Sequence, residues 1–243
     1  MTRLLALIYA LACYALFGCA FLLLIAFQLG IPALPVSKSL SIGPSVAINI
    51  ALITAFGSTH SIMARDGFKR VWTKIISPTV ERATYVLQSS VFLIAIVWFW
   101  QPLPTVVWTT DGVIALFIGG LFWAGVAIVL LSTFLLGHLE FVGIAAPLNK
   151  LRGVAEPQDV FRTPMLYSVV RHPLQLGLLL VFFALPVMTA GHLLFAGLMT
   201  IYMMIGLHFE ERALVKRFGE TYRTYQSHVP MLIPRLWPTR RRA

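Results

Sequence analysis

The chain has 243 residues, of which 58% are hydrophobic and only 12% charged, and its formal net charge is +10 at pH 7. A soluble domain carries roughly twice that share of charge, and a soluble fold of this length cannot hide so much apolar surface, so the composition excludes a soluble globular protein. No nucleic acid partner is expected either, because the basic residues flank apolar segments and form no reading helix or aromatic-basic motif.

Six apolar segments match, fully or nearly, the roughly 20 helical residues that cross a bilayer core. In chain order they cover residues 4–29, 44–63, 84–101, 112–136, 173–190 and 193–209. The last two meet at Ala190, Gly191 and His192, which predicts a tight antiparallel hairpin that either crosses the membrane or re-enters it. The predicted fold class is all-α, a polytopic membrane protein with about six transmembrane helices.

The segments between the predicted helices differ sharply in charge. With six spans, only Lys38 of the 19 basic residues falls on one side of the membrane. Basic residues concentrate in cytoplasmic loops, so both termini are predicted to be cytoplasmic. The chain is expected to form a single membrane domain over residues 1–243, with N-terminal helices in 1–136 and a more polar part in 137–243 that ends in a cytoplasmic helical segment.

Three glutamates directly adjoin apolar helices: Glu140, Glu210 and Glu211. A carboxylate at that depth is costly unless it is paired or solvated by a cavity. Each one alone is readily explained as a helix-end acid that pairs with an arginine. Glu210 and Glu211 together, close to His208, favour a functional site.

The segment 207–219 has apolar residues at helical spacing and ends at Gly219, a plausible C-cap, so it predicts a helix that leaves the membrane. Tyr222 and Tyr225 follow three residues apart, and a further helical turn would place both rings on one face. They are either ordinary interfacial aromatics or the lining of a cavity for a flat or cationic ligand.

Polar residues also stand where the apolar helices begin or end. In the sequence Arg171-His172-Pro173 the proline suits a first helical turn, and an arginine is expected at a cytoplasmic boundary, which leaves His172 for ligand binding. His60 and His138 close the second and fourth spans, where a lone histidine is more often structural than catalytic. Zinc-hydrolase, paired-cysteine, phosphate-loop and dinucleotide motifs are missing, so no metal is expected.

The C-terminal part resembles the isoprenylcysteine carboxyl methyltransferase superfamily over about 70 residues. The elements that carry this resemblance are Arg171–Gly177, Glu210–Leu214, Phe218-Gly219, Tyr222, Tyr225 and Val229-Pro230. Upstream elements resemble the narrower family of bacterial methanethiol S-methyltransferases. These are His60–Arg65, Glu81–Leu87, His138-x-Glu140 and Val229–Pro234.

Two departures from that narrower family concern the acceptor more than the cofactor. The family more usually has Asn-His-Phe-Asp/Glu-Leu-Phe-Gly where this chain has Gly137-His138-Leu139-Glu140-Phe141-Val142-Gly143. An aromatic residue is common where Gln175 stands.

The resemblance implies methyl transfer from S-adenosylmethionine, bound in a cytosol-facing pocket, to an acceptor that arrives from the membrane. Its most specific form is methylation of methanethiol to dimethyl sulfide in a bacterial inner membrane, with lipids around the helices. The residues it assigns to the cofactor site are Arg171, His172, Pro173, Gly177, Glu210, Glu211, Tyr222 and Tyr225.

A thiol acceptor must lose its proton, because the thiolate is the nucleophile. We expect His138 or Glu140 to accept that proton, or Arg65 and Arg171 to lower the pKa of the thiol. His60 and Arg65 are expected to contact the acceptor.

Three other functions stay open at this point. In the first, the acceptor of the methyl group is a lipid, an isoprenoid thiol or another hydrophobic molecule instead of a small thiol. In the second, the protein is a membrane reductase that uses NADPH, since sterol reductases share a related C-terminal architecture. In the third, it is a non-enzymatic transporter or assembly factor.

Overall fold

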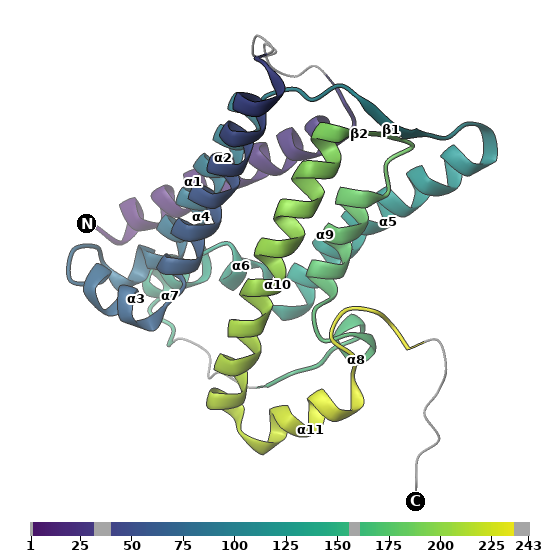
Figure 1. Ribbon diagram of the computed structural model, residues 1–243. Helices are drawn as coiled ribbons and strands as arrows, with labels where there is room; N and C mark the ends of the chain where they lie inside the picture. Colours follow the sequence, from purple (N-terminus) through teal and green to yellow (C-terminus); the bar gives the residue numbers. More distant parts are fainter. Residues whose placement is uncertain (1, 32–39, 156–160, 236–243) are drawn as a thin grey trace, which may run out of the picture.

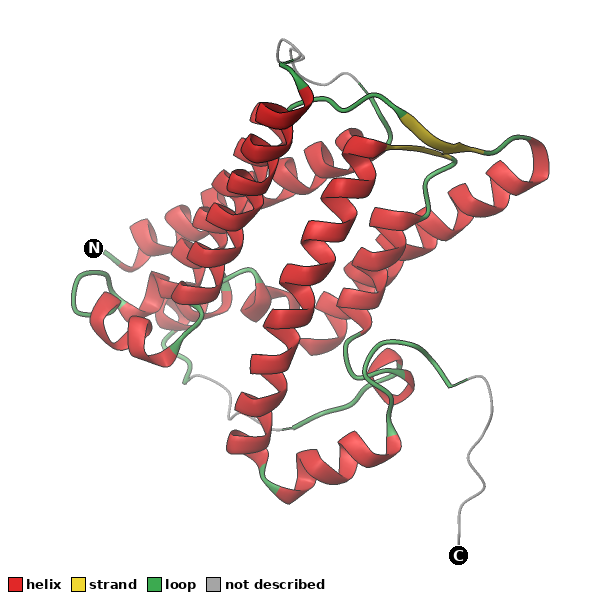
Figure 2. Cartoon of the chain, viewed as in Figure 1, coloured by secondary structure: helices red, strands yellow, loops and turns green. Residues whose placement is uncertain are grey.

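The computed structural model describes residues 2–31, 40–155 and 161–235, so Lys38 and the basic end Arg240–Arg242 lie outside the described residues. Within these ranges the chain is almost entirely helical (Figure 2). The helices are α1 (Arg3–Gln28), α2 (Ile42–Met63), α3 (Asp66–Trp72), α4 (Pro78–Phe99), α5 (Gly112–Leu136), α6 (His138–Phe141), α7 (Ala145–Arg152), α8 (Leu166–Val169), α9 (Pro173–Phe183), α10 (Ala190–Phe218) and α11 (Glu220–His228). Two short strands, β1 (Val106–Thr109) and β2 (Val187–Thr189), pair antiparallel.

Five of the described helices are long and apolar enough to cross a membrane, namely α1, α2, α4, α5 and α10. A sixth, α9, is apolar but has only 11 residues. At 1.5 Å per residue it covers about 17 Å, roughly half of a bilayer core. The predicted all-α polytopic membrane fold is confirmed, with a fifth apolar segment that is helical over only part of its length.

The predicted end of that fifth segment at residue 190 was wrong, because the helix ends at Phe183. Pro186 explains the break, since a proline lacks the backbone N–H and disfavours helical geometry in the residue before it. The chain continues as β2, and the indole of Trp108 on β1 donates to the carbonyl oxygen of Leu185 at 3.1 Å. Strands of 3 and 4 residues carry too short an alternation to be predicted from sequence.

Helix α10 is continuous over 29 residues, so the predicted span 193–209 and the predicted emerging helix 207–219 form one element. It begins with the Thr189 side chain accepting from the backbone N–H of His192 and ends at Gly219, whose φ of 57° belongs to the left-handed region. Glycine adopts that conformation without a Cβ penalty, as the predicted C-cap requires. The chain then turns into α11 and runs back beneath the bundle (Figure 1).

The long helices pack in two groups that α10 joins. Helix α1 lies along α4, while α5 lies along α9 on the other side, and α10 contacts both α2 and α9 (Figure 1). Phe122, Phe182 and Phe195 are fully buried where α5, α9 and α10 meet. Helices α5 and α9 approach each other closely, since a Cβ on Gly177 would lie 2.7 Å from the carbonyl oxygen of Gly125.

The short polar elements gather at one end of the bundle. Helices α3, α7, α8 and α11 all lie there, and the β1–β2 pair lies at the opposite end (Figure 1). This is the arrangement that the charge distribution of the loops predicts. That the α11 end is cytoplasmic stays a prediction.

The crossing of α5 and α9 gives a direct test of the packing. In Gly125→Ala the new methyl group would lie 2.7 Å from the Gly177 carbonyl oxygen, which forces the helices apart. We expect the free energy of unfolding to fall by about 1–3 kcal/mol, the usual cost of overpacking. Thermal unfolding in detergent measures it. Gly119→Ala on the same helix is the control, since nothing lies within 4 Å of its Cβ. Equal melting temperatures for the two variants would contradict this contact.

Candidate active site

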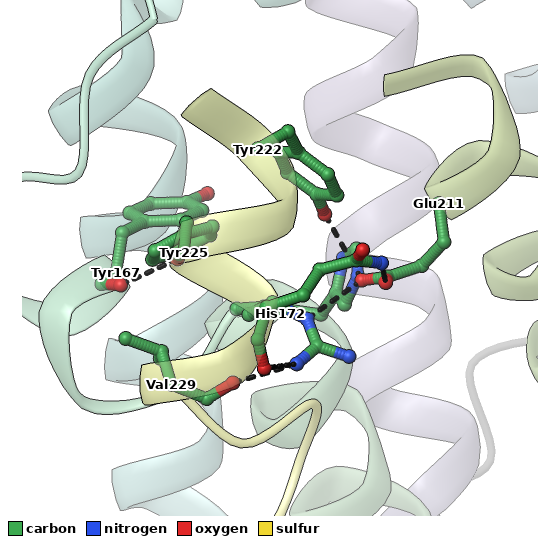
Figure 3. Close-up of polar contacts among 8 residues, drawn as sticks. Tyr167, His172, Glu211, Tyr222, Tyr225 and Val229 are labelled. Carbon is green, nitrogen blue, oxygen red and sulfur yellow. Dashed lines mark hydrogen bonds and ion pairs between the residues drawn. The ribbon is translucent and has the colours of Figure 1, made fainter. Parts of the chain in front are cut away.

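One carboxylate, Glu211 on α10, collects donors from two other parts of the chain (Figure 3). Its Oε1 accepts from Arg171 Nε at 2.8 Å, His172 Nε2 at 2.7 Å and the Tyr222 hydroxyl at 3.0 Å. The Gln226 amide donates to the other oxygen, Oε2. Arg171 and His172 immediately precede α9, whereas Tyr222 and Gln226 lie one turn apart on α11, so this carboxylate joins three elements.

Arg171 also holds the segment that follows α11. Its Nη1 donates to the carbonyl oxygens of Gln226 at 3.1 Å and Val229 at 2.6 Å. The backbone N–H of Arg171 donates to Pro230 at 2.9 Å, and that of His172 to Met231 at 3.1 Å. The arginine therefore fixes the C-terminal segment against the start of α9, and a role toward a ligand stays a prediction.

The two tyrosines of α11 do different things. Tyr222 is fully buried, and burial together with the Glu211 carboxylate raises the pKa of its hydroxyl well above the ordinary value, so it stays protonated and donates. Tyr225 donates to the carbonyl oxygen of Tyr167 at 2.5 Å, and burial raises the pKa of Tyr225 to about 12. Phe161 packs edge-on against both rings, at 5.6 Å and 5.3 Å between centroids. We call Phe161, Tyr222 and Tyr225 the aromatic cluster.

Glu210, the neighbour of Glu211, is in the opposite situation. It is exposed, and it makes no hydrogen bond or ion pair with any residue that the structure describes. It directly precedes Glu211 on α10, and Glu211 bonds the Tyr222 hydroxyl of the aromatic cluster at 3.0 Å. Glu210 is thus an unpaired carboxylate beside the aromatic cluster.

His138 and Glu140 lie on the short helix α6. The His138 ring bonds the Tyr14 hydroxyl at 3.0 Å and Thr133 Oγ1 at 2.9 Å, and burial lowers the pKa of His138, so the ring is neutral at pH 7. Glu140 is exposed, with its carboxylate folded over Gly137, where a Cβ would lie 2.5 Å from Oε2. No hydrogen bond in the described chain joins either residue to Glu211. Their role as proton acceptors stays a prediction.

His60 and Arg65 both lie beside α10. His60 accepts a hydrogen bond from the Tyr85 hydroxyl on α4 and contacts Ser89 Oγ at 2.8 Å. The guanidinium of Arg65 stacks over the ring of Phe209, 4.1 Å from its centroid. Phe209 directly precedes Glu210, so Arg65 approaches the part of α10 that carries this carboxylate, whereas His60 packs against Tyr202, two turns earlier on the same helix.

Pro173 and Gly177 have structural explanations of their own. Pro173 is the buried first residue of α9, as its position in the sequence predicts. Gly177 lets α5 pack closely, as described above. Their assignment to a cofactor site stays a prediction.

Sequence reasoning missed two residues of the network. Gln226 lies four positions after Tyr222, so helical spacing alone would have placed it on the same face of α11. Tyr167 gives no such signal, because it lies on the short helix α8 and meets α11 through a tertiary contact. A groove of about 240 Å³ adjoins this network, lined by His208, Glu211, Arg212, Val215 and Gln226. In the described residues no three His, Cys, Asp or Glu side chains gather as metal ligands.

The fold and these contacts define an all-α polytopic membrane protein with a polar network at one end of its last two apolar helices. The chain is 43% identical to methanethiol S-methyltransferase 2 of Bradyrhizobium diazoefficiens, covering 98% of this chain and 93% of that one. It is 44% identical to methanethiol S-methyltransferase of a Pseudomonas species, over 96% and 91% of the two chains. It is 42% identical to methanethiol S-methyltransferase of Mycobacterium tuberculosis, over 99% of both.

The chain therefore belongs to the methanethiol S-methyltransferase family, which makes it a methyltransferase and confirms the family to which the sequence motifs pointed. No family model matches the chain. No solved structure matches it.

The Glu211 network predicts a local loss of order when its charge is removed. Glu211→Gln keeps the shape of the side chain but leaves Arg171 without its counter-ion, and breaking one partner of a buried pair costs about 3–5 kcal/mol. Side-chain exposures of 12% on both partners justify treating the pair as buried. Amide hydrogen exchange should therefore accelerate in α11 and the segment after it.

Glu220→Gln is the matched control, because Glu220 is 84% exposed and its contact with Arg223 is 3.5 Å long. We expect no change in exchange for this variant. Identical exchange of α11 in both variants would show that the network does not hold the C-terminal segment.

Proposed function

We propose that the protein transfers the methyl group of S-adenosylmethionine to methanethiol and so forms dimethyl sulfide. The names of its relatives support the reaction and the acceptor. The observation in the structure that carries the proposal is Glu210, an unpaired carboxylate beside the aromatic cluster, at the end of two apolar helices. S-adenosylmethionine supplies a methyl group already activated on a positively charged sulfur.

The residues present suit such a donor. Its ribose hydroxyls and amino group need an acceptor, which Glu210 provides without breaking an existing bond. Its sulfonium is attracted to aromatic faces by roughly 0.5–2 kcal/mol, and the half-buried rings of Phe161 and Tyr225 are the faces proposed to meet it. Glu211 has all its hydrogen bonds inside the protein, so its task is to hold α11 and the start of α9 in position. Fixed geometry of this kind is the main help that a methyl transfer requires.

The acceptor is proposed to approach from the lipid. A small apolar thiol partitions into the hydrocarbon phase, and His60 and Arg65 are the residues proposed to meet it, a role that the contact of Arg65 with Phe209, the neighbour of Glu210, supports. A lipid or isoprenoid thiol remains the alternative acceptor. We further propose that the α11 end faces the cytoplasm of a bacterium, which the charge distribution and the bacterial relatives support.

The decisive experiment measures the reaction in cells and in purified protein. Cells that express the chain and are fed methanethiol should release dimethyl sulfide, detected in the gas phase, whereas cells with an empty vector should not. Labelled S-adenosylmethionine with a panel of small, lipid and isoprenoid thiols then ranks the acceptors. Isothermal titration should show binding of S-adenosylhomocysteine and none of NADPH. Binding of NADPH alone would replace the proposal by a reductase, and binding of neither by a non-enzymatic function.

Glu210 gives a sharper test of the donor site. Glu210→Gln removes a charge-assisted hydrogen bond, worth about 1.5–3 kcal/mol, so the affinity for S-adenosylhomocysteine should fall by about tenfold or more. Isothermal titration in detergent measures this. The exposed Glu220→Gln serves as the control and should bind as the unaltered protein does. An unchanged affinity in Glu210→Gln would remove this carboxylate from the donor site.

A further inference from the structure

His60 has a defined tautomer because of its neighbour Ser89. The Ser89 hydroxyl donates its single proton to the main-chain carbonyl of Tyr85 at 2.8 Å. Toward His60 it can then only accept, so Nδ1 of His60 carries the ring proton in their 2.8 Å contact. The other nitrogen, Nε2, presents a lone pair and accepts from the Tyr85 hydroxyl. Hydrogen bonds thus run from Tyr85 through His60 and Ser89 to the backbone of α4.

This arrangement leaves the Tyr85 oxygen able to accept a proton. Its own proton points to His60, so its lone pairs are available to a group that approaches from the other side. A neutral imidazole behind a hydroxyl is the arrangement that activates hydroxyl groups for proton transfer. Tyr85 and His60 are both half-buried, between the apolar helices α2 and α4.

The surroundings suit a small apolar thiol with a developing negative charge. Phe56 and Tyr202 pack against the His60 ring at 5.3 Å and 6.2 Å. The Arg82 guanidinium lies 5.1 Å from the Tyr85 ring centroid, fixed by its bond to the Phe141 carbonyl oxygen. The ionisable groups that act on the Tyr85 hydroxyl come from three helices: Arg82 and Glu81 on α4, His60 on α2, and Tyr202 and Glu210 on α10.

We propose that the Tyr85 hydroxyl contacts the acceptor thiol and passes its proton to His60, an assignment that rests on the proposed function. The S–H bond breaks as an O–H bond forms on Tyr85, while the original O–H proton of Tyr85 moves to His60 Nε2. The thiol sulfur uses the freed electron pair to bond the methyl carbon, and the electrons of the broken methyl–sulfonium bond stay on the donor sulfur. The positive charge of the donor thereby ends on the imidazole. Tyr85 is a catalytic residue and His60 a positioning residue.

A second chain of hydrogen bonds that could relay a proton runs from Tyr14 through His138 to Thr133, and it fits the proposed methyl transfer less well. Thr133 donates to the Leu130 carbonyl oxygen, so His138 again carries its proton on Nδ1 and accepts from Tyr14. The side-chain contacts of His138 are with Tyr14 on α1 and with Thr133 and Phe134 on α5. The His60 ring, in contrast, lies 6.2 Å from the ring of Tyr202 on α10, the helix that carries Glu210. The relay that adjoins the proposed donor site is therefore the one at His60.

The test compares Tyr85→Phe with the unaltered protein in detergent, using S-adenosylmethionine and methanethiol. Loss of a proton-transfer group lowers rates by about 100-fold or more, so kcat should fall by that factor. Affinity for S-adenosylhomocysteine should stay the same. Without the relay only preformed thiolate reacts, so kcat/KM of the variant should rise about tenfold per pH unit below the pKa of the thiol. The unaltered protein should show a much flatter profile.

An acidic aryl thiol, already ionised at the assay pH, separates proton transfer from structural damage. It needs no proton acceptor, so the deficit of Tyr85→Phe should disappear with it, and that of His60→Gln likewise. Tyr9→Phe is the matched control, because it removes a tyrosine hydroxyl that bonds Thr84 on the same helix at 3.0 Å. This variant should keep the full rate and the flat pH profile.

Each other outcome is decisive as well. Tyr85→Phe with an unchanged rate, or with an equal deficit for both thiols, overturns the relay while the proposed function stands. Loss in His138→Gln that the acidic thiol restores, with Tyr85→Phe intact, assigns the proton to His138 and also overturns it. An unaltered protein that methylates no thiol refutes the proposed function and the relay together.

Discussion

The ionised carboxylate of Glu211 is the interaction on which the C-terminal half of the molecule depends. Arg171 and His172 meet it from the start of α9, and Tyr222 and Gln226 from α11. Removing a charged pair from water is favourable only when the remaining lone pairs and protons are satisfied, and four donors to two oxygens meet that condition. The segment after α11 buries Val229 and Leu232, and the hydrogen bonds from Arg171 and His172 fix its backbone against the start of α9.

The two successive glutamates on α10, Glu210 and Glu211, have different roles because of helix geometry. Adjacent residues on a helix point about 100° apart, so the side chains of Glu210 and Glu211 leave α10 in different directions. Glu211 turns toward α11 and is saturated by donors, whereas Glu210 is exposed and has no partner in the described chain. A carboxylate whose oxygens already accept from protein donors holds the surrounding elements in place, whereas a carboxylate without protein partners is available to bind a ligand. For that reason the proposed ligand contact belongs to Glu210.

The sequence predicted well what depends on composition and local geometry, and poorly what depends on contacts between distant segments. Spans of 20 or more apolar residues and the left-handed cap at Gly219 follow from local rules, and they agree with the structure. The early end of α9 at Phe183 follows from Pro186, a local signal, but the apolar residues continue past that point and led to the prediction of a longer helix. Arg171 was expected to face a ligand, and only the structure shows it bound to the carbonyl oxygen of Val229, since no sequence pattern encodes such a partner. The contact of Tyr225 with the backbone of Tyr167 is of the same kind.

Helix α10 connects the two halves of the proposed reaction. A water-soluble donor and a lipid-soluble thiol must meet where polar and apolar surroundings adjoin, and one continuous helix of 29 residues passes through both. Tyr202 and Phe209 on this helix contact His60 and Arg65 on the apolar side, and Glu210 follows directly. The Arg82 guanidinium lies 5.1 Å from the Tyr85 ring centroid, so a cation stands beside the hydroxyl that is proposed to take the thiol proton. The negative charge that develops on the thiol sulfur during the transfer can therefore be offset by this nearby cation, without water entering between the apolar helices.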